Sequence, residues 1–313
     1  MVAERLPAYA AALVIDWFAG RSGRAYALAS AAESEPPVFV AEGPEGTLAL
    51  AVAPLWEPEG DPAAEDAREM MEERLSGGLV RGPHLLWVPP RASVPAAEPA
   101  ASDFVQRVQQ AAAPLSPGGR GEVALPVTLQ LAKLRDEGGY ASVTGALSRW
   151  WTQITERVDG TFYVNANRMR RAPQSAAARE VLFDRIGQLS QALGSGAAVE
   201  FETDEAWTVQ RLAGEPLGVT GFAIAQAPPR ADPTDGTLLR RLVRRRLKDA
   251  SAALDGVAAD VKGVALLAIY EYAEHENIGA FVRSLDPALY AKLALVAALV
   301  DGEVRPIFQP KAV

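Results

Sequence analysis

Clusters of proline and glycine cut the 313-residue chain into segments of alternating helical and strand pattern, and this punctuation limits the folds open to it. The breaks fall at 56–62, 88–99, 115–122, 138–139 and 227–236. Between them, apolar residues recur at helical or at strand spacing in both halves of the chain. The sequence therefore predicts an α/β fold with two lobes of mixed sheet flanked by helices, one over 1–137 and one over 138–313.

The first lobe is predicted to run helix, strand, strand, strand, helix, strand, with one further helix inserted. Its strongest signal is a hairpin, in which strands at 38–40 and 48–54 flank the turn Gly43-Pro44-Glu45-Gly46. The other expected elements are a helix at 4–18, the inserted helix at 61–75 with Asp61 as N-cap, a strand at 84–88, a helix at 102–113 capped by Ser102, and a strand at 123–134.

The second lobe continues the same alternation and ends in a hairpin. Its expected elements are helices at 147–158, 176–193, 237–254 and 278–283, strands at 161–164, 199–202, 207–212, 219–225 and 264–270, and a terminal hairpin of 293–300 and 304–308. The hairpin turns at Asp301-Gly302, a dipeptide that favours the tight two-residue turn.

Composition excludes several classes of site. The chain has no cysteine and two histidines, so it has no disulfide or thiolate nucleophile and little with which to build a histidine-ligated zinc or a Ser-His-Asp relay. The glycine-rich run at 118–121 lacks the Lys-Ser/Thr pair and the following helix of a phosphate-binding loop. Carboxylate chemistry, binding or an architectural role remain.

The opening segment and the net charge bear on location and partners. Glu4 and Asp16 stand where a signal peptide would be basic and then apolar, and no apolar run reaches the roughly 18 residues of a membrane span. We therefore expect a cytoplasmic protein without membrane association. A net charge of −8 argues against general coating of nucleic acid, although a local basic patch could still bind it.

The segments Glu35-Pro-Pro-Val-Phe-Val40 and 47–56, joined by the Gly-Pro-Glu-Gly turn, resemble the active-site hairpin of the restriction-endonuclease-like, PD-(D/E)XK, superfamily. The resemblance covers roughly residues 1–135 and implies an α-β-β-β-α-β core. In that family an acidic residue after the proline and an acidic-x-Lys triplet on the next strand hold Mg²⁺ and activate water.

The three chemical positions of that hairpin are occupied here by Val38, Ala51 and Ala53. Alanine and valine have no atom that ligates a metal. The resemblance therefore implies a nuclease-like scaffold whose active site is empty, and it transfers no catalytic residue to this chain.

A basic helix is predicted at 237–254. Arg241, Arg244, Arg245 and Lys248 are three or four residues apart and share one helical face, opposite a second face of leucine, valine and alanine. This face is either a solvated surface or a stripe that contacts phosphates, and no aromatic residue interleaves to stack on bases. A second basic spot lies at 168–171.

The candidate carboxylates are Glu200 and Glu202, which would share one face of a strand, with Asp204 close behind. Such acids could bind a hard cation such as Mg²⁺ or act as general acid and base. The alternative is the solvated face of a half-buried sheet.

Histidine and tryptophan supply weaker candidates. His84 precedes a buried strand, and Glu271 and His275 are spaced as a helical metal pair but lack the second histidine of the zinc-hydrolase signature, so a surface ion cluster is expected. Trp150 and Trp151 would point about 100° apart on a helix. At most one faces the core, and the other is expected to pack between lobes or to anchor a partner.

These observations favour a bacterial binding or assembly protein on a nuclease-like scaffold, without catalysis or a cofactor, and with nucleic acid at the basic helix as a candidate partner. One alternative is an active metal-dependent nuclease or phosphodiesterase that uses Mg²⁺ and the carboxylates near 200–205. Another is a structural homo-oligomer that associates through the hairpin at 293–308, whose apolar strands favour association at a sheet edge.

Overall fold

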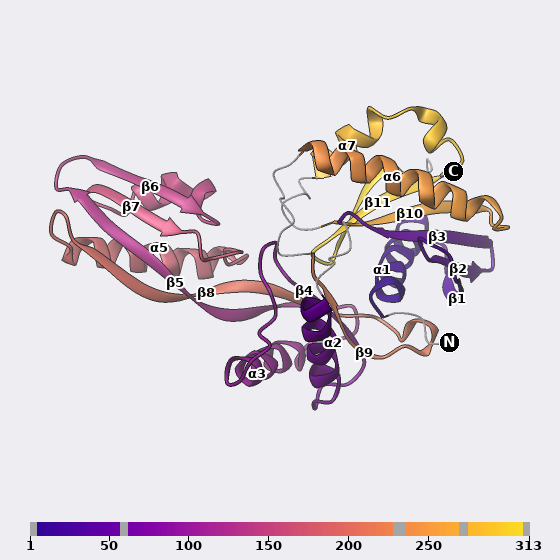
Figure 1. The fold of residues 1–313 in the computed structure, drawn as a ribbon, viewed down its shortest axis with the longest axis horizontal. Helices are drawn as coiled ribbons and strands as arrows, with labels where there is room; N and C mark the ends of the chain where they lie inside the picture. Colours follow the sequence, from indigo (N-terminus) through magenta and orange to yellow (C-terminus); the bar gives the residue numbers. More distant parts are fainter. Residues whose placement is uncertain (1–4, 57–61, 228–235, 269–274, 309–313) are drawn as a thin grey trace. The chain divides into compact units, whose positions relative to one another are not determined.

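The computed structural model describes residues 5–56, 62–227, 236–268 and 275–308 as a mixed α/β fold. Two six-stranded mixed sheets, flanked by helices, make up its framework (Figure 1). The α/β class predicted from the sequence is therefore confirmed. None of the described helices is long and apolar enough to cross a membrane.

The first sheet has the order β1-β2-β3-β10-β11-β12. Three strands from the start of the chain form an antiparallel meander: β1 (Ala27–Ala32), β2 (Val38–Gly43) and β3 (Gly46–Pro54). Three from its end complete the sheet: β10 (Val261–Ala268) and β11 (Leu295–Val300), parallel to β3, and β12 (Glu303–Phe308), antiparallel to β11.

Both predicted hairpins are confirmed. Gly43 faces Gly46 at the turn between β2 and β3. At the turn between β11 and β12, Asp301 has φ 52° and Gly302 has φ 80°, the pair of positive φ angles that the tight hairpin turn requires.

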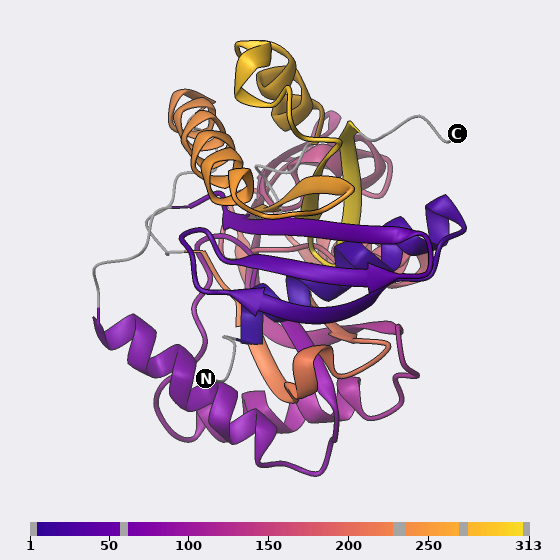
Figure 2. The ribbon, with the colours of Figure 1, turned by 90° about the vertical axis from the view of Figure 1, so that its right-hand side faces the viewer.

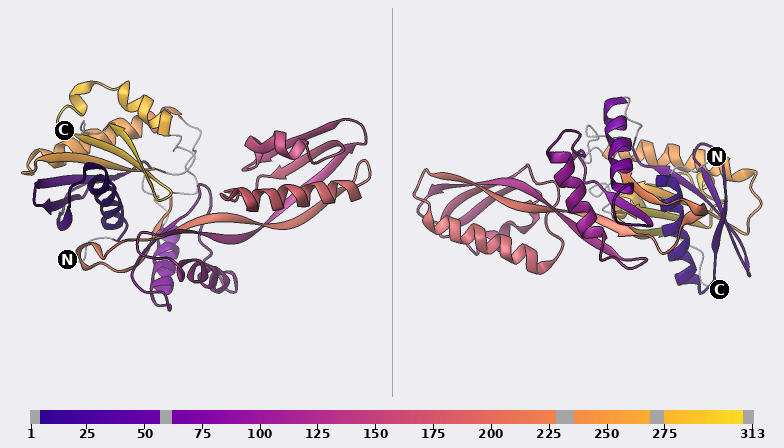
Figure 3. Two further views of the ribbon diagram at one scale, coloured as in Figure 1. Left: turned by 180° about the vertical axis from the view of Figure 1, so that it is seen from behind. Right: turned by 90° about the horizontal axis from the view of Figure 1, so that it is seen from below.

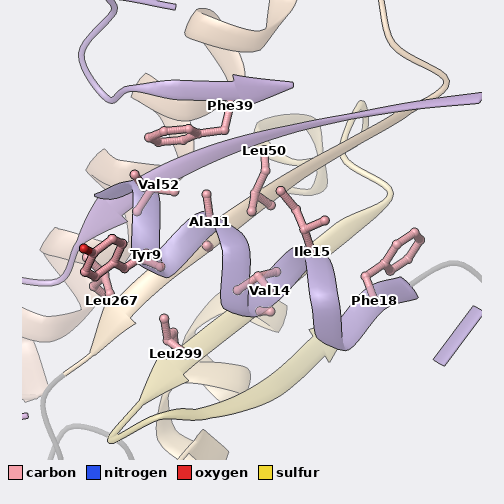
Figure 4. Close-up of a cluster of buried hydrophobic side chains, with 14 of the residues drawn as sticks. Tyr9, Ala11, Val14, Ile15, Phe18, Phe39, Leu50, Val52, Leu267 and Leu299 are labelled. Atoms are coloured by element: carbon pink, nitrogen blue, oxygen red, sulfur yellow. The ribbon is translucent and has the colours of Figure 1, made fainter. Parts of the chain in front are cut away.

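Helices cover both faces of this sheet (Figure 3). On one face lies α1 (Arg5–Ser22), whose Tyr9, Val14 and Ile15 pack in one buried cluster with side chains of β2, β3, β10 and β11 (Figure 4). On the other face lie α6 (Gly236–Asp255) and α7 (His275–Arg283). Residues 48–53 of β3 are therefore buried on both sides, as is usual for a strand in a sheet that helices cover on both faces.

The second sheet has the order β6-β7-β5-β8-β4-β9. Its strands are β4 (Pro83–Trp87), β5 (Arg120–Arg135), β6 (Gly139–Gly145), β7 (Gly160–Ala166), β8 (Ala198–Arg211) and β9 (Gly221–Ala225). The accompanying helices are α2 (Pro62–Ser76), α3 (Ala100–Ala112), α4 (Trp151–Thr155), α5 (Ala176–Ala192) and the 3₁₀ turn η1 (Ser148–Trp150). Two further 3₁₀ turns contact elements of the first sheet and its helices: η2 (Pro216–Gly218) and η3 (Pro287–Leu289).

The chain forms two compact units, one of residues 1–121 with 208–313 and one of residues 122–207. The contiguous division expected after residue 137 does not coincide with them. The expected first lobe placed the strands at 84–88 and 123–134 beside the hairpin, whereas β4 and β5 belong to the other sheet. The apolar edge of β3 is filled instead by β10, which buries Val264 and Leu266 on one face of the sheet and Ala265 and Leu267 on the other.

Several predicted elements differ in detail. The strands expected at 199–202 and 207–212 are one strand, β8, and the helix expected at 147–158 is the short pair η1 and α4. Ser102 lies inside α3, whose N-cap is Pro99, and the expected cap Asp61 lies outside the described residues. The strands β1 and β6 have no counterpart among the predictions.

Candidate functional site

The positions that match the nuclease hairpin lie in a closed apolar core. Val38 faces Ala51 across the antiparallel pair, and these two residues and Ala53 are all 0% exposed. They pack in a cluster with the buried face of α6, including Leu242, Val243 and Leu247. The side chains of this cluster are all apolar and offer no ligand to a metal ion.

A buried arginine closes the end of this hairpin. Arg246 on α6 donates from Nε to the carbonyl of Pro54 at 2.9 Å and from an Nη to the carbonyl of Trp56 at 3.0 Å. Its side chain is buried, so these are charge-assisted bonds in a poorly solvated site. The group at the carboxyl end of β3 is thus a fixed cation. Its spacing from Leu242 and Ala250, four residues either way, was the sequence signal that could have placed it inside.

The outer face of α6 carries five exposed cations: Arg240, Arg241, Arg244, Arg245 and Lys248. Arg240 donates to Ser284 Oγ at 2.9 Å and is thereby tied to the end of α7. Within the described ranges, Arg241, Arg244 and Lys248 form no ion pair. The predicted basic face is therefore present, on a helix whose other face is anchored in the core.

Several other arginines that the structure describes have acidic partners. Arg107 pairs with Asp103 at 2.8 Å, Arg74 with Glu98 at 2.8 Å, and Arg157 with both Glu180 and Asp184. Exposed arginines outside α6, among them Arg21, Arg81 and Arg135, also form no ion pair within the described residues. The basic face of α6 is therefore distinguished by the clustering of its cations and not by their lack of partners.

The candidate carboxylates Glu200, Glu202 and Asp204 all lie exposed on one face of β8, with Phe201 buried on the other. No three His, Asp or Glu side chains in the described part of the chain are grouped so that they could hold a metal ion. The convergence that metal-dependent chemistry needs is not found among these acids.

Glu205, next in the same segment, turns inward. It accepts from the backbone N–H of Arg170 at 2.5 Å and from Trp207 Nε1 at 2.8 Å, and burial raises the pKa of Glu205. The acid therefore pins the basic segment 168–171 against β8. This segment belongs to the unit of residues 122–207, whereas α6 belongs to the other unit.

His84 is a packing residue of β4. Its ring stacks on Phe222 with centroids 4.8 Å apart, its Nδ1 lies 3.1 Å from the carbonyl oxygen of Gly82, and burial lowers the pKa of His84. The second predicted histidine site falls partly outside the described residues, since these exclude Glu271 and the side chain of His275.

The two tryptophans point to different environments, as predicted. Trp150 packs against the core of its own unit, and the Arg149 guanidinium lies 3.9 Å from its ring centroid. Trp151 is 48% exposed, with its ring centroid 6.1 Å from that of Tyr140. Both tryptophans lie within residues 122–207.

Comparison with protein-family models, with curated proteins and with solved structures found no match.

Proposed function

We propose that the protein is a binding or assembly component without catalytic activity, built on a nuclease-like scaffold, and that the outer face of α6 contacts nucleic acid. The observation that carries the proposal is the pairing of two surfaces on α6. Its inner face packs Val38, Ala51 and Ala53 into an apolar cluster, and its outer face gathers exposed cations on one side of the helix.

The topology of the first sheet supports the scaffold part of this proposal. The elements α1, β1, β2 and β3 are followed, among those that build this sheet and its helices, by α6 and β10. That order is the α-β-β-β-α-β order implied by the resemblance, and β10 runs parallel to β3. The elements from α2 to β9 then form an insertion between β3 and α6.

The charge of α6 supports the nucleic-acid part. Phosphate binding scales with the number of cations presented, and Arg241, Arg244 and Lys248 form no ion pair with the acids that the structure describes. Arg246 and the apolar face hold the helix rigidly, so the cations keep their spacing. A cytoplasmic location in a bacterium is part of the same proposal, because nucleic acid is accessible there.

The test is nucleic-acid binding measured as a function of salt. The triple variant Arg241→Gln/Arg244→Gln/Lys248→Gln should reduce the slope of log K against log salt by about 0.9 per lost contact with duplex DNA and about 0.7 with single strands. The matched control is Arg21→Gln/Arg81→Gln/Arg135→Gln, which removes the same charge from other exposed positions. Absence of binding at low salt, or equal losses in both triple variants, would contradict the proposal.

The absence of catalysis is tested separately. We expect no cleavage of single- or double-stranded DNA or RNA with Mg²⁺ or Mn²⁺. Robust cleavage that Glu200→Gln abolishes would instead establish the carboxylates near 200–205 as a nuclease site.

A further inference from the structure

The strands at the sheet margins differ in how their backbone groups are satisfied. At β9, two side chains of α2 accept hydrogen bonds from backbone amides of the strand. Ser76 Oγ accepts from the amide of Phe222, and Glu72 Oε1 accepts from the amide of Ile224, both at 2.8 Å. The Tyr9 hydroxyl donates to the carbonyl of Gly221 at 3.0 Å. A further strand is therefore blocked from adding to β9.

Two other margins are guarded in different ways. At β6, Thr155 Oγ1 accepts from the amide of Ala141 at 3.1 Å, and α4 lies alongside. At β12, Pro306 has no N–H to offer, and Glu303 and Arg305 add charge. Proline, charge and covering helices are the usual means by which proteins prevent strand addition.

The margin at β1 contains neither proline nor a charged residue, and the short 3₁₀ turn η2 contacts it. Its six residues, Ala-Leu-Ala-Ser-Ala-Ala, are small apart from Leu28 and uncharged, and five of them are exposed. The ribbon of the first sheet shows the three-strand meander to which β1 belongs (Figure 2). In the described part of the chain, only β2 pairs with its backbone. The pairing with β2 shifts register between Leu28 and Ser30, so that Ala29 has no partner residue on β2.

The charges that flank β1 indicate which strand would complete it. Arg24 lies before the strand and Glu33 and Glu35 lie after it. Two copies of β1 placed antiparallel bring Arg24 of each against the acids of the other, whereas a parallel arrangement opposes like charges. Arg24 also contacts Glu45 at 3.0 Å, while Glu33 and Glu35 are exposed and have no ion pair in the described residues.

We propose that β1 pairs antiparallel with β1 of a second copy of this chain, across a two-fold axis, so that two six-stranded sheets become one. The contact is isologous, since the same strand serves both copies. Small side chains allow close approach, and the partly buried Tyr26 and Leu28 would be covered further. One short strand per copy buries little area, so the dimer should be weak, with a dissociation constant in roughly the micromolar range or above.

The first test is sedimentation of the full chain from about 1 to 200 μM, the range set by a weak interface. We expect a monomer–dimer equilibrium that Ala31→Lys weakens by about tenfold or more, because a lysine on an edge strand opposes the addition of a further strand. Ala177→Lys adds the same charge to an exposed site on α5 and should leave the equilibrium unchanged. Monomer throughout the range, or a dimer insensitive to Ala31→Lys, overturns the proposal.

The second test uses the absence of native cysteine. A short bismaleimide should cross-link two copies of the Ser30→Cys variant to each other, and it should not cross-link two copies of the Ala177→Cys variant. Circular dichroism of each variant confirms that it is folded. Equal cross-linking of both variants, or a dimer lost through substitutions in β12, would place the contact elsewhere and overturn the proposal.

The third test reverses the charges. Glu33→Lys/Glu35→Lys should weaken the dimer, and adding Arg24→Glu to that variant should restore it. Failure of the restoration, in a protein that remains folded, would refute the antiparallel arrangement.

Discussion

Replacing Ala51 by aspartate restores a carboxylate at a position where the nuclease-like resemblance expects one, and the structure predicts that the protein will not tolerate it. Ala51 is 0% exposed, faces Val38 on one side and Val264 on the other, and lies in the cluster beneath α6. Neither these neighbours nor the leucines beneath α6 offer the new side chain a cation or a side-chain donor. In the folded state the neutral, protonated form of the new aspartate is therefore favoured.

The cost follows from the protonation equilibrium. An aspartate with an ordinary pKa of about 3.9 in the unfolded chain must take up a proton to enter this core, which at pH 7 costs about 4 kcal/mol. Crowding adds roughly 1 to 3 kcal/mol, and the unsatisfied carboxyl adds a similar amount. The sum of about 6 kcal/mol or more is comparable with the whole stability of many domains, about 5 to 15 kcal/mol.

Ala51→Asn is the matched control, because asparagine has nearly the same shape and does not ionise. Urea unfolding followed by tryptophan fluorescence should show that both variants are destabilised. At pH 7 the free energy of unfolding should be lower for the aspartate variant than for the asparagine variant. Because the folded-state pKa of the new aspartate is raised, its extra penalty is absent below about pH 4 and grows by about 1.4 kcal/mol per pH unit above it.

The reasoning is refuted if Ala51→Asp unfolds at the same urea concentration as the unsubstituted protein at pH 7. It is also refuted if Mg²⁺ stabilises the aspartate variant and not the asparagine variant. Either result would mean that the hairpin opens onto water or other polar groups rather than into a sealed core.

Three further substitutions probe other parts of the structure. Gly302→Ala should lower the thermal midpoint of unfolding, because Gly302 has a φ of 80°, which disfavours other residues, and an added Cβ would lie 2.5 Å from Gln210 Oε1. An unchanged midpoint in calorimetry would argue against this packing. Burial lowers the pKa of His84, so the stability that depends on its neutral form is lost as the pH falls below about 6.5. The free energy of unfolding should therefore fall less between pH 7.5 and 5 in His84→Leu than in the unsubstituted protein, and an equal fall in urea unfolding of both proteins would contradict this. Glu72→Ala should cost about 1 to 3 kcal/mol by leaving the Ile224 amide without its acceptor, and faster hydrogen exchange at Ile224 is the accompanying sign.

Local features of the fold were predictable from the sequence. The turns at 43–46 and 301–302 follow from glycine chemistry within four residues, and α6 follows from its spacing of leucines and arginines. These elements depend on neighbours in the chain, so a periodic pattern is sufficient to find them.

The pairing of distant strands was not predictable in the same way. The apolar run at 84–88 is buried in either sheet, so its pattern does not indicate which sheet it joins. The alanine-rich β1 lacks the alternation that marks a strand, because an exposed margin buries neither face. The inward turns of Arg246 and Glu205 were also missed, since each depends on partners from another element: the carbonyls of 54 and 56, and the amide of 170.

The position of β10 in the first sheet has a consequence for synthesis. Thr47, at the start of β3, is bonded to Asp260, 213 residues later in the chain. At about 5 to 20 residues per second, a ribosome takes roughly 10 to 40 s to make that stretch. During this interval a strand with apolar side chains on both faces waits beside β2 and α1 without its central neighbour. Newly made chains would be most vulnerable to aggregation in that interval. Their need for chaperones should increase with the time that passes before β10 leaves the ribosome.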